Sequence, residues 1–222
     1  FSRDMFKWGK ESATPIVPIV SSAKLAVTAE KLGAAAVIVE GKEAGGHLGT
    51  DRSVQEIVPE VVDQVRIPVI AAGGIIDGKD IIEAFSWGAN GVQMGTRFAA
   101  SFESGAPEAF KEMYLRATPE DVILINSPVG MPGRGLKNKF TERLFNNEDM
   151  RPSQCDSCLK KCGKYYCILD ALNNAQQGNV DEGVVFSGEH VDRIKEILSV
   201  KEIFTRIKNQ IAGFPVEEER II

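Results

Sequence analysis

"IPVIAAGGIIDGKDIIEAFSWGA", residues 67–89, combines a buried strand, a glycine turn and an amphipathic helix. The run at 67–74 is apolar throughout and ends in two glycines, which is typical of a strand covered on both faces. In the helical part Ile81 and Phe85 fall on one face, and Gly88 follows as a C-terminal cap. This order predicts a parallel sheet with helices packed against it.

The same unit recurs on both sides of this stretch. The apolar runs at 15–20 and 34–40 predict two further strands, and the run at 91–96 predicts a fourth. Helical patterns follow, one ended by Gly33 and another with an apolar face over 54–65. Strands that are separated by amphipathic helices indicate an α/β protein.

Two α/β architectures compete, the open doubly wound sheet and the eight-stranded (β/α) barrel. Four strand and helix units are too few for a closed barrel. The chain also begins in "FSRDMFKWGKE" without the usual start of a domain, so we expect an upstream half to be missing.

Strand and helix no longer alternate in the second half of the chain. Loop-rich text and a cysteine segment come first, and helical spacing returns at 191–198 and in a last helix, where Ser199 and Glu202 form a capping box. We therefore expect an α/β body at 1–117 and a mostly helical C-terminal extension at 118–222 that packs on it.

Composition limits the classes of function. The 222 residues are 43% hydrophobic and 26% charged, which is the profile of a globular protein. The net charge of -5 argues against nucleic acid as a partner, because phosphate binding requires a clustered positive surface. No apolar run is long enough for a membrane helix and no signal peptide is apparent, so we expect a cytoplasmic protein without a membrane contact.

Glycines stand at the carboxyl ends of two predicted strands, Gly73 and Gly74 after one and Gly95 after the next. Backbone N–H groups can approach an anion there without obstruction by side chains, and phosphate suits this geometry best. The alternative is that the glycines only permit tight turns. The sequence leaves both explanations open.

His47 lies in the glycine-rich loop "EAGGHLGTD", just beyond a predicted strand. A neutral imidazole there could act as a general base or donate a hydrogen bond to a substrate oxygen. The alternative is a structural or surface histidine. The other histidine, His190, lies at a predicted helix start and is expected to be structural.

The four cysteines of the chain form one cluster with the spacing C-x2-C-x3-C-x4-C. Four soft ligands at short spacing could bind Zn or an iron-sulfur cluster. The alternative is a helical hairpin that carries partly buried free thiols. The candidate metal ligands are Cys155, Cys158, Cys162 and Cys167.

Three motifs together resemble one enzyme family. "VIVEGKEAGGHLG" (37–49), "IPVIAAGGIIDGKDI" (67–81) and "GANGVQMGTRFAAS" (88–101) are similar to the flavin-dependent nitronate monooxygenases, once called 2-nitropropane dioxygenases, and to the flavin-dependent enoyl-acyl-carrier-protein reductases. The resemblance implies an FMN-binding (β/α)8 TIM barrel. The four units of this chain would be strands five to eight, that is, the C-terminal half of that barrel.

The resemblance also implies roles for individual residues. His47 would be the catalytic histidine near the flavin ring, and the glycine loops and "QMGT" would hold FMN and its phosphate. Glu40 occupies a position where many of the monooxygenases carry Gln, and Glu is more similar to the enoyl reductases. The implied cofactor-binding residues are Glu40, Gly45, Gly46, Gly73, Gly74, Gln93, Met94, Gly95 and Thr96.

The leading hypothesis is an FMN-dependent monooxygenase that oxidises alkyl nitronates with O2 to a carbonyl compound and nitrite. Later text at 127–140 and 165–178 resembles a bacterial subgroup of the same family and favours this assignment. The alternative is an NAD(P)H- and FMN-dependent reductase of enoyl thioesters. A third hypothesis is a non-catalytic module that pairs with another chain. A homodimer is a possible assembly of the protein.

Overall fold

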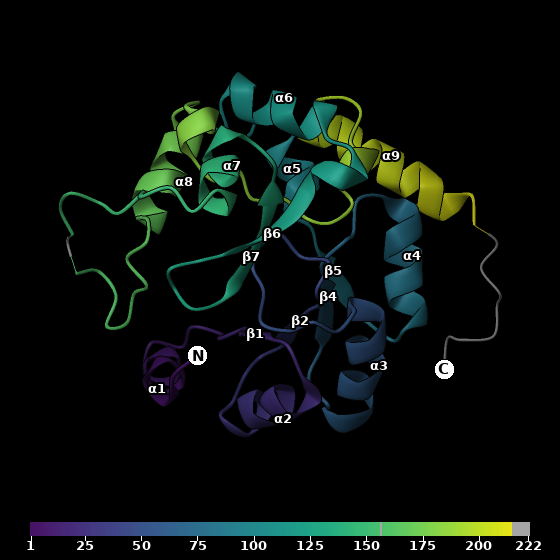
Figure 1. Ribbon diagram of the computed structural model, residues 1–222. Coiled ribbons are helices and arrows are strands. Elements are labelled where there is room, and N and C mark those ends of the chain that lie inside the picture. Colours follow the sequence, from purple (N-terminus) through teal and green to yellow (C-terminus); the bar gives the residue numbers. More distant parts are fainter. Residues whose placement is uncertain (156, 215–222) are drawn as a thin grey trace.

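The computed structural model describes residues 1–155 and 157–214 of the chain. Its main sheet has four parallel strands in the order β1-β2-β4-β5 (Figure 1). In the register, Glu40 lies opposite Ala72 and Ala72 lies opposite Gln93, so three strands end at one edge of the sheet. The strands are β1 (Ile19–Val20), β2 (Val37–Glu40), β4 (Val69–Ala72) and β5 (Gly91–Gln93).

Helices follow the strands as the sequence predicts, and their ends are set by local chemistry. Ser53 accepts a hydrogen bond from the N–H of Glu56 in a capping box at the start of α3. At the start of α4, Asp77 accepts from the N–H of Asp80 in a second capping box. Gly88 takes a φ of +94°, which favours glycine after a helix. The helices of this part are α1 (Arg3–Glu11), α2 (Ala23–Lys31), α3 (Val54–Gln64), α4 (Gly78–Ser86) and α5 (Thr96–Ala99).

A second, antiparallel sheet has the strand order β3-β7-β6. Strand β3 (Gly46–His47) belongs to the loop after β2, whereas β6 (Val122–Asn126) and β7 (Pro132–Leu136) form a hairpin of the C-terminal region. Gly46 pairs with Arg134 and His47 pairs with Gly133. The two regions that the sequence separates at residue 117 therefore share a sheet.

The remaining helices cover the body. Helix α9 lies beside α4, and α6, α7 and α8 surround the hairpin (Figure 1). Ser199 caps α9 by accepting a hydrogen bond from the N–H of Glu202, which confirms the predicted capping box. These helices are α6 (Glu108–Arg116), α7 (Lys139–Phe145), α8 (Ile168–Gln176) and α9 (Val200–Ala212), with 3-10 turns at Pro119–Asp121, Val180–Glu182 and Val191–Arg193.

The helical spacing at 191–198 does not form an α-helix, so that prediction is wrong. Val191 and Ile194 are fully buried in a core between α6 and β7, and Leu198 makes a parallel bridge with Ser101. The apolar residues of this segment fill separate gaps and do not share a helical face. Among the described helices, none is long and apolar enough to cross a bilayer.

The main core lies between the parallel sheet and helices α2, α3 and α9. Valines of β2 and β4 and one face of α3 are fully buried in it, and Ile203 and Ile207 of α9 join them. The C-terminal helix is thus part of the body's core.

Ile57→Ala is expected to lower the free energy of unfolding by about 2–5 kcal/mol, because Ile57 is fully buried in this core and alanine leaves a cavity. Urea denaturation followed by circular dichroism measures the change. The matched control is Leu25→Ala on α2, where the side chain is exposed and the change is expected within about 0.5 kcal/mol. Equal effects of the two substitutions would contradict this description of the core.

Candidate active site

A cavity of about 380 Å³ opens where β2, β4 and β5 end. This is the edge at which ligands bind in open α/β sheets and in (β/α) barrels. Most of the cofactor-binding residues that the family resemblance implies line this cavity. From that set the lining includes Glu40, Gly45, Gly46, Gly73, Gly74, Gln93, Gly95 and Thr96.

Gly73 and Gly45 illustrate two different reasons for glycine in this lining. Gly73 has a φ of +108°, where a side chain would be strained, and its Cβ would lie 3.0 Å from the backbone nitrogen of Ala44. A Cβ on Gly45 would come within 2.6 Å of the carbonyl carbon of Ser187. Gly95 differs, because a Cβ there would meet no heavy atom within 4 Å. The first two glycines permit close backbone approach, and the third borders open space.

The C-terminal region supplies part of the cavity wall, which the sequence did not reveal. Ser187, Gly188 and His190 line the cavity. The N–H of Gly188 donates to the Thr96 hydroxyl at 2.9 Å, and His190 Nδ1 lies 2.9 Å from the carbonyl oxygen of Gly74. His190, expected to be structural, therefore contacts a glycine loop of the site. The local sequence "SGEH" (187–190) gives no signal of this role, because the contacts join segments far apart in the chain.

Glu40 and Met94, two of the residues that the resemblance implies for cofactor binding, differ in whether they line the cavity. Glu40 is half-buried at the end of β2, and burial raises the pKa of its carboxyl above the ordinary value. Met94 packs its side chain against the main core and is not among the residues that line the cavity. The structure thus brings Glu40 to the site but turns the Met94 side chain away from it.

His47 lies beside the cavity and not in its lining. Its ring packs edge to face against Phe186, with 5.2 Å between ring centroids, and Phe186 lines the cavity. Its Nε2 lies 2.7 Å from the Ser127 hydroxyl. Burial lowers the pKa of His47 below its ordinary value. The imidazole is therefore held by two neighbours and favours its neutral form.

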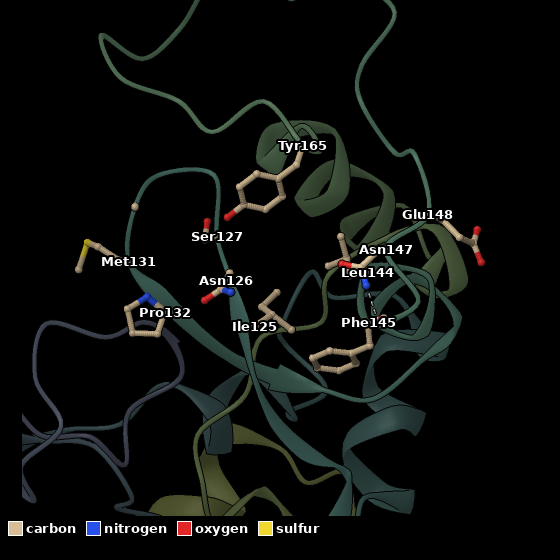
Figure 2. A pocket seen from close by; sticks show the side chains of 11 residues that line it. Ile125, Asn126, Ser127, Met131, Pro132, Leu144, Phe145, Asn147, Glu148 and Tyr165 are labelled. Carbon is tan, nitrogen blue, oxygen red and sulfur yellow. Dashed lines mark hydrogen bonds between the residues drawn. The ribbon is translucent and has the colours of Figure 1, made fainter.

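A second cavity, of about 630 Å³, has Ser127 in its lining (Figure 2). Met131 and Pro132 of the hairpin turn lie at one end of it and Leu144 and Phe145 of α7 at the other, so its walls are mainly apolar. Ser127 is buried and links this cavity to His47. His47 thus contacts one lining residue of the glycine-lined cavity, Phe186, and one of the apolar cavity, Ser127.

The cysteine segment does not form the expected helical hairpin, so that alternative is wrong. The described residues from 151 to 166 contain no helix, and α8 starts only after Cys167. Cys155, Cys158 and Cys162 line a separate cavity of about 500 Å³ together with three lysines. Among residues 1–155 and 157–214, no three histidine, cysteine or acidic side chains are arranged to hold a metal. A Zn or iron-sulfur site stays a prediction that needs rearrangement of the segment.

The fold and the cavity place the chain in a structural class, the α/β proteins that have a glycine-lined site at the carboxyl ends of parallel strands. In this chain a histidine lies beside that site. The family model "Nitronate monooxygenase" matches residues 2–210. The chain belongs to the nitronate monooxygenase family, as its motifs indicate.

Two relatives with different names are similar to this chain. A "Probable nitronate monooxygenase" of Staphylococcus saprophyticus is 36% identical over 81% of this chain and 52% of the relative. A Mycobacterium tuberculosis protein named "(3aS,4S,5R,7aS)-5-hydroxy-7a-methyl-1-oxo-octahydro-1H-indene-4-carboxyl-CoA dehydrogenase" is 37% identical over 89% of this chain and 65% of its own length. The chain thus spans between half and two thirds of these two relatives.

Solved structures share the fold. FabK from Thermotoga maritima matches with a TM-score of 0.79 and 35% identity over 95% of this chain and 65% of its own. A nitroalkane oxidase from Streptomyces ansochromogenes matches with a TM-score of 0.77 and 25% identity over 96% of this chain and 61% of its own.

The His47 ring is expected to titrate below about pH 6.5, the ordinary value, because burial disfavours the charged imidazolium. The unfolded chain then takes up the proton first, so His47 contributes stability that is lost as the pH falls below about 6.5. NMR titration of the two histidine rings measures the pKa, and His47→Gln identifies the signal. A pKa at or above the ordinary value would contradict this account of the site.

Proposed function

We propose that this chain supplies the cofactor-binding part of an FMN-dependent oxidoreductase that acts on alkyl nitronates. The main support is the glycine-lined cavity of about 380 Å³, with His47 next to its wall. We also propose that the four parallel strands are the second half of a (β/α)8 barrel. The similarity to the longer FabK chain and the exposed side chain of Ile19 on edge strand β1 support this arrangement.

The residues of the cavity fit FMN. The N–H groups of Thr96 and Arg97 at the start of α5, and those of the turn at Gly73 and Gly74, are donors of the kind that hold a phosphate. The open space at Gly95 leaves room for it. The Thr96 hydroxyl accepts from Gly188 and keeps its own O–H to donate. Glu40 and Gln93 lie at the strand ends, where the polar edge of a flavin ring would find hydrogen-bond partners.

His47 would bind and orient the substrate. Its Nε2 is engaged by Ser127, which leaves Nδ1 for a nitro oxygen or for the α-proton of a neutral nitroalkane. The lowered pKa keeps the imidazole neutral near pH 7, as both roles require. Ser127 and Phe186 hold the ring in place, so little ordering is needed when a substrate binds.

When bound, FMN would supply the electron acceptor for the oxidation, and O2 would be the final oxidant that yields carbonyl compound and nitrite. The contribution of this chain is the position of the substrate and the neutral base. The apolar cavity beyond Ser127 would exclude water and hold the alkyl part of the nitronate.

Reduction of an enoyl thioester with NAD(P)H is the second candidate. Glu40 favours it, because Glu at this position is the feature that resembles the enoyl reductases. The size and apolar lining of the second cavity also suit a bulky acyl group, and the M. tuberculosis relative is named for a CoA thioester. Rapid anaerobic bleaching of the bound flavin by NADH would favour this candidate over the first.

Gly95→Leu is expected to weaken FMN binding more than about tenfold without loss of the fold, because the new side chain enters open space on the cavity border. Quenching of FMN fluorescence measures the dissociation constant. The matched control is Gly105→Leu, where a Cβ also meets nothing but the residue lies outside the cavity lining. Unchanged FMN affinity in Gly95→Leu would contradict the placement of the cofactor.

His47→Gln is expected to lower kcat/KM for a neutral nitroalkane by about 10²–10⁴-fold, the usual contribution of a general base. The loss with a preformed nitronate is expected to be smaller, because its α-proton is already gone. Oxygen consumption by the FMN-loaded protein measures both rates. An equal loss with the two substrates would exclude proton removal by His47 and leave only its orienting role.

A further inference from the structure

A third cavity, of about 190 Å³, lies between α4, the start of α5 and α9. It shares only Ile76 with the lining of the cavity proposed for FMN. Its lining carries more positive than negative side chains. The charged residues are Asp77, Arg97, Arg193, Lys195, Glu196 and Arg206.

Both acidic residues of this cavity already have partners. Arg193 contacts Asp77 at 2.9 Å, and it also contacts Asp80 at 2.8 Å. Arg206 contacts Glu196 at 2.5 Å. Within the described part of the chain, these pairs leave Arg97 and Lys195 without an ion pair to a carboxylate.

Arg97 is the unusual member of the set, because its side chain is buried, with 7% exposed. Its Nη2 donates to the carbonyl oxygens of Ala100 and Glu196 at 2.5 and 3.0 Å. Its Nε has no hydrogen-bond acceptor among the described residues. Two carbonyl groups satisfy donors but do not neutralise a charge. The Glu196 carboxylate attracts the guanidinium from beyond ion-pair distance and is already paired with Arg206, so the buried charge of Arg97 is incompletely balanced, which is costly.

Other donors face the same cavity. The Gln210 Oε1 accepts from the N–H of Gly78 at 2.7 Å, so the amide NH2 of Gln210 remains to donate. Lys195 is exposed on the rim, where it can contact a ligand that arrives from solvent. A guanidinium, an ammonium and an amide donor around a small space are typical of an oxyanion site.

We propose that this cavity binds a phosphate-type dianion, with Arg97 and Lys195 as its charged contacts. Its volume is half that of the neighbouring cavity and suits a phosphoryl group better than a ring system. The ion would bridge α9 to the residues that follow Thr96, and so would brace the wall of the FMN cavity from behind. The source is either free phosphate or the phosphate monoester of a nucleotide.

The test compares inorganic phosphate with chloride at equal ionic strength. Phosphate is expected to raise the melting temperature of the protein, because it binds only the folded chain. Lys195→Gln is expected to weaken phosphate affinity about tenfold in isothermal calorimetry, the loss that corresponds to one charge-assisted hydrogen bond. The matched control is Lys201→Gln, an exposed lysine of α9 outside the cavity lining, which keeps the wild-type affinity.

A second variant distinguishes phosphate binding in this cavity from phosphate binding in the cavity proposed for FMN. Gly95→Leu fills the space proposed for FMN and is expected to leave the response to phosphate unchanged. AMP in place of phosphate distinguishes the sources, since tighter binding of AMP identifies a nucleotide and equal binding identifies the free ion. The proposal is overturned if phosphate and chloride give the same melting temperature, or if Lys195→Gln binds phosphate as well as Lys201→Gln does.

Discussion

Two residue pairs, Gly46 with Arg134 and His47 with Gly133, hold the loop after β2 against a hairpin of the C-terminal region. Without this short antiparallel ladder the loop would be a flexible glycine-rich segment, and the imidazole would have no fixed direction. With it, Ser127 at the end of β6 comes within hydrogen-bond distance of His47. The chemistry proposed for the histidine therefore depends on a pairing between distant parts of the chain.

Arg134 strengthens this junction. Its side chain is buried, and Nε and Nη2 donate to the carbonyl oxygen of Lys42 at 3.1 and 2.8 Å. Nη2 also lies 3.5 Å from Glu189 Oε2. One guanidinium thus connects the His47 loop, β7 and the segment that lines the cavity with Ser187 and His190. Loss of such a group leaves buried acceptors unsatisfied, which costs more than the net gain from making the bonds.

Most of the α/β body could be predicted from the sequence because its signals are local. Apolar runs mark the parallel strands, and Ser53 and Ser199 mark helix starts through contacts only three residues long. The wall formed by Ser187 and His190 could not be predicted, since no nearby residue determines where that segment packs. Met94 shows a further limit, because a motif names adjacent residues together although successive side chains of an extended chain point to opposite faces.

Phe186 lies at the contact between His47 and the glycine-lined cavity, because its ring packs against the imidazole and also lines that cavity. A Cβ on Gly133 would lie 2.9 Å from its ring, so the glycine of β7 makes room for the aromatic side chain. The backbone carbonyl oxygen of Phe186 accepts a hydrogen bond from the hydroxyl of Tyr114, a buried residue of α6. Tyr114 therefore holds the backbone of Phe186, and the space at Gly133 together with the His47 ring accommodates its side chain. On its other contact His47 meets Ser127, which lines the apolar cavity between the hairpin and α7, so in the proposed function the shape of these two elements would select the substrate that meets His47.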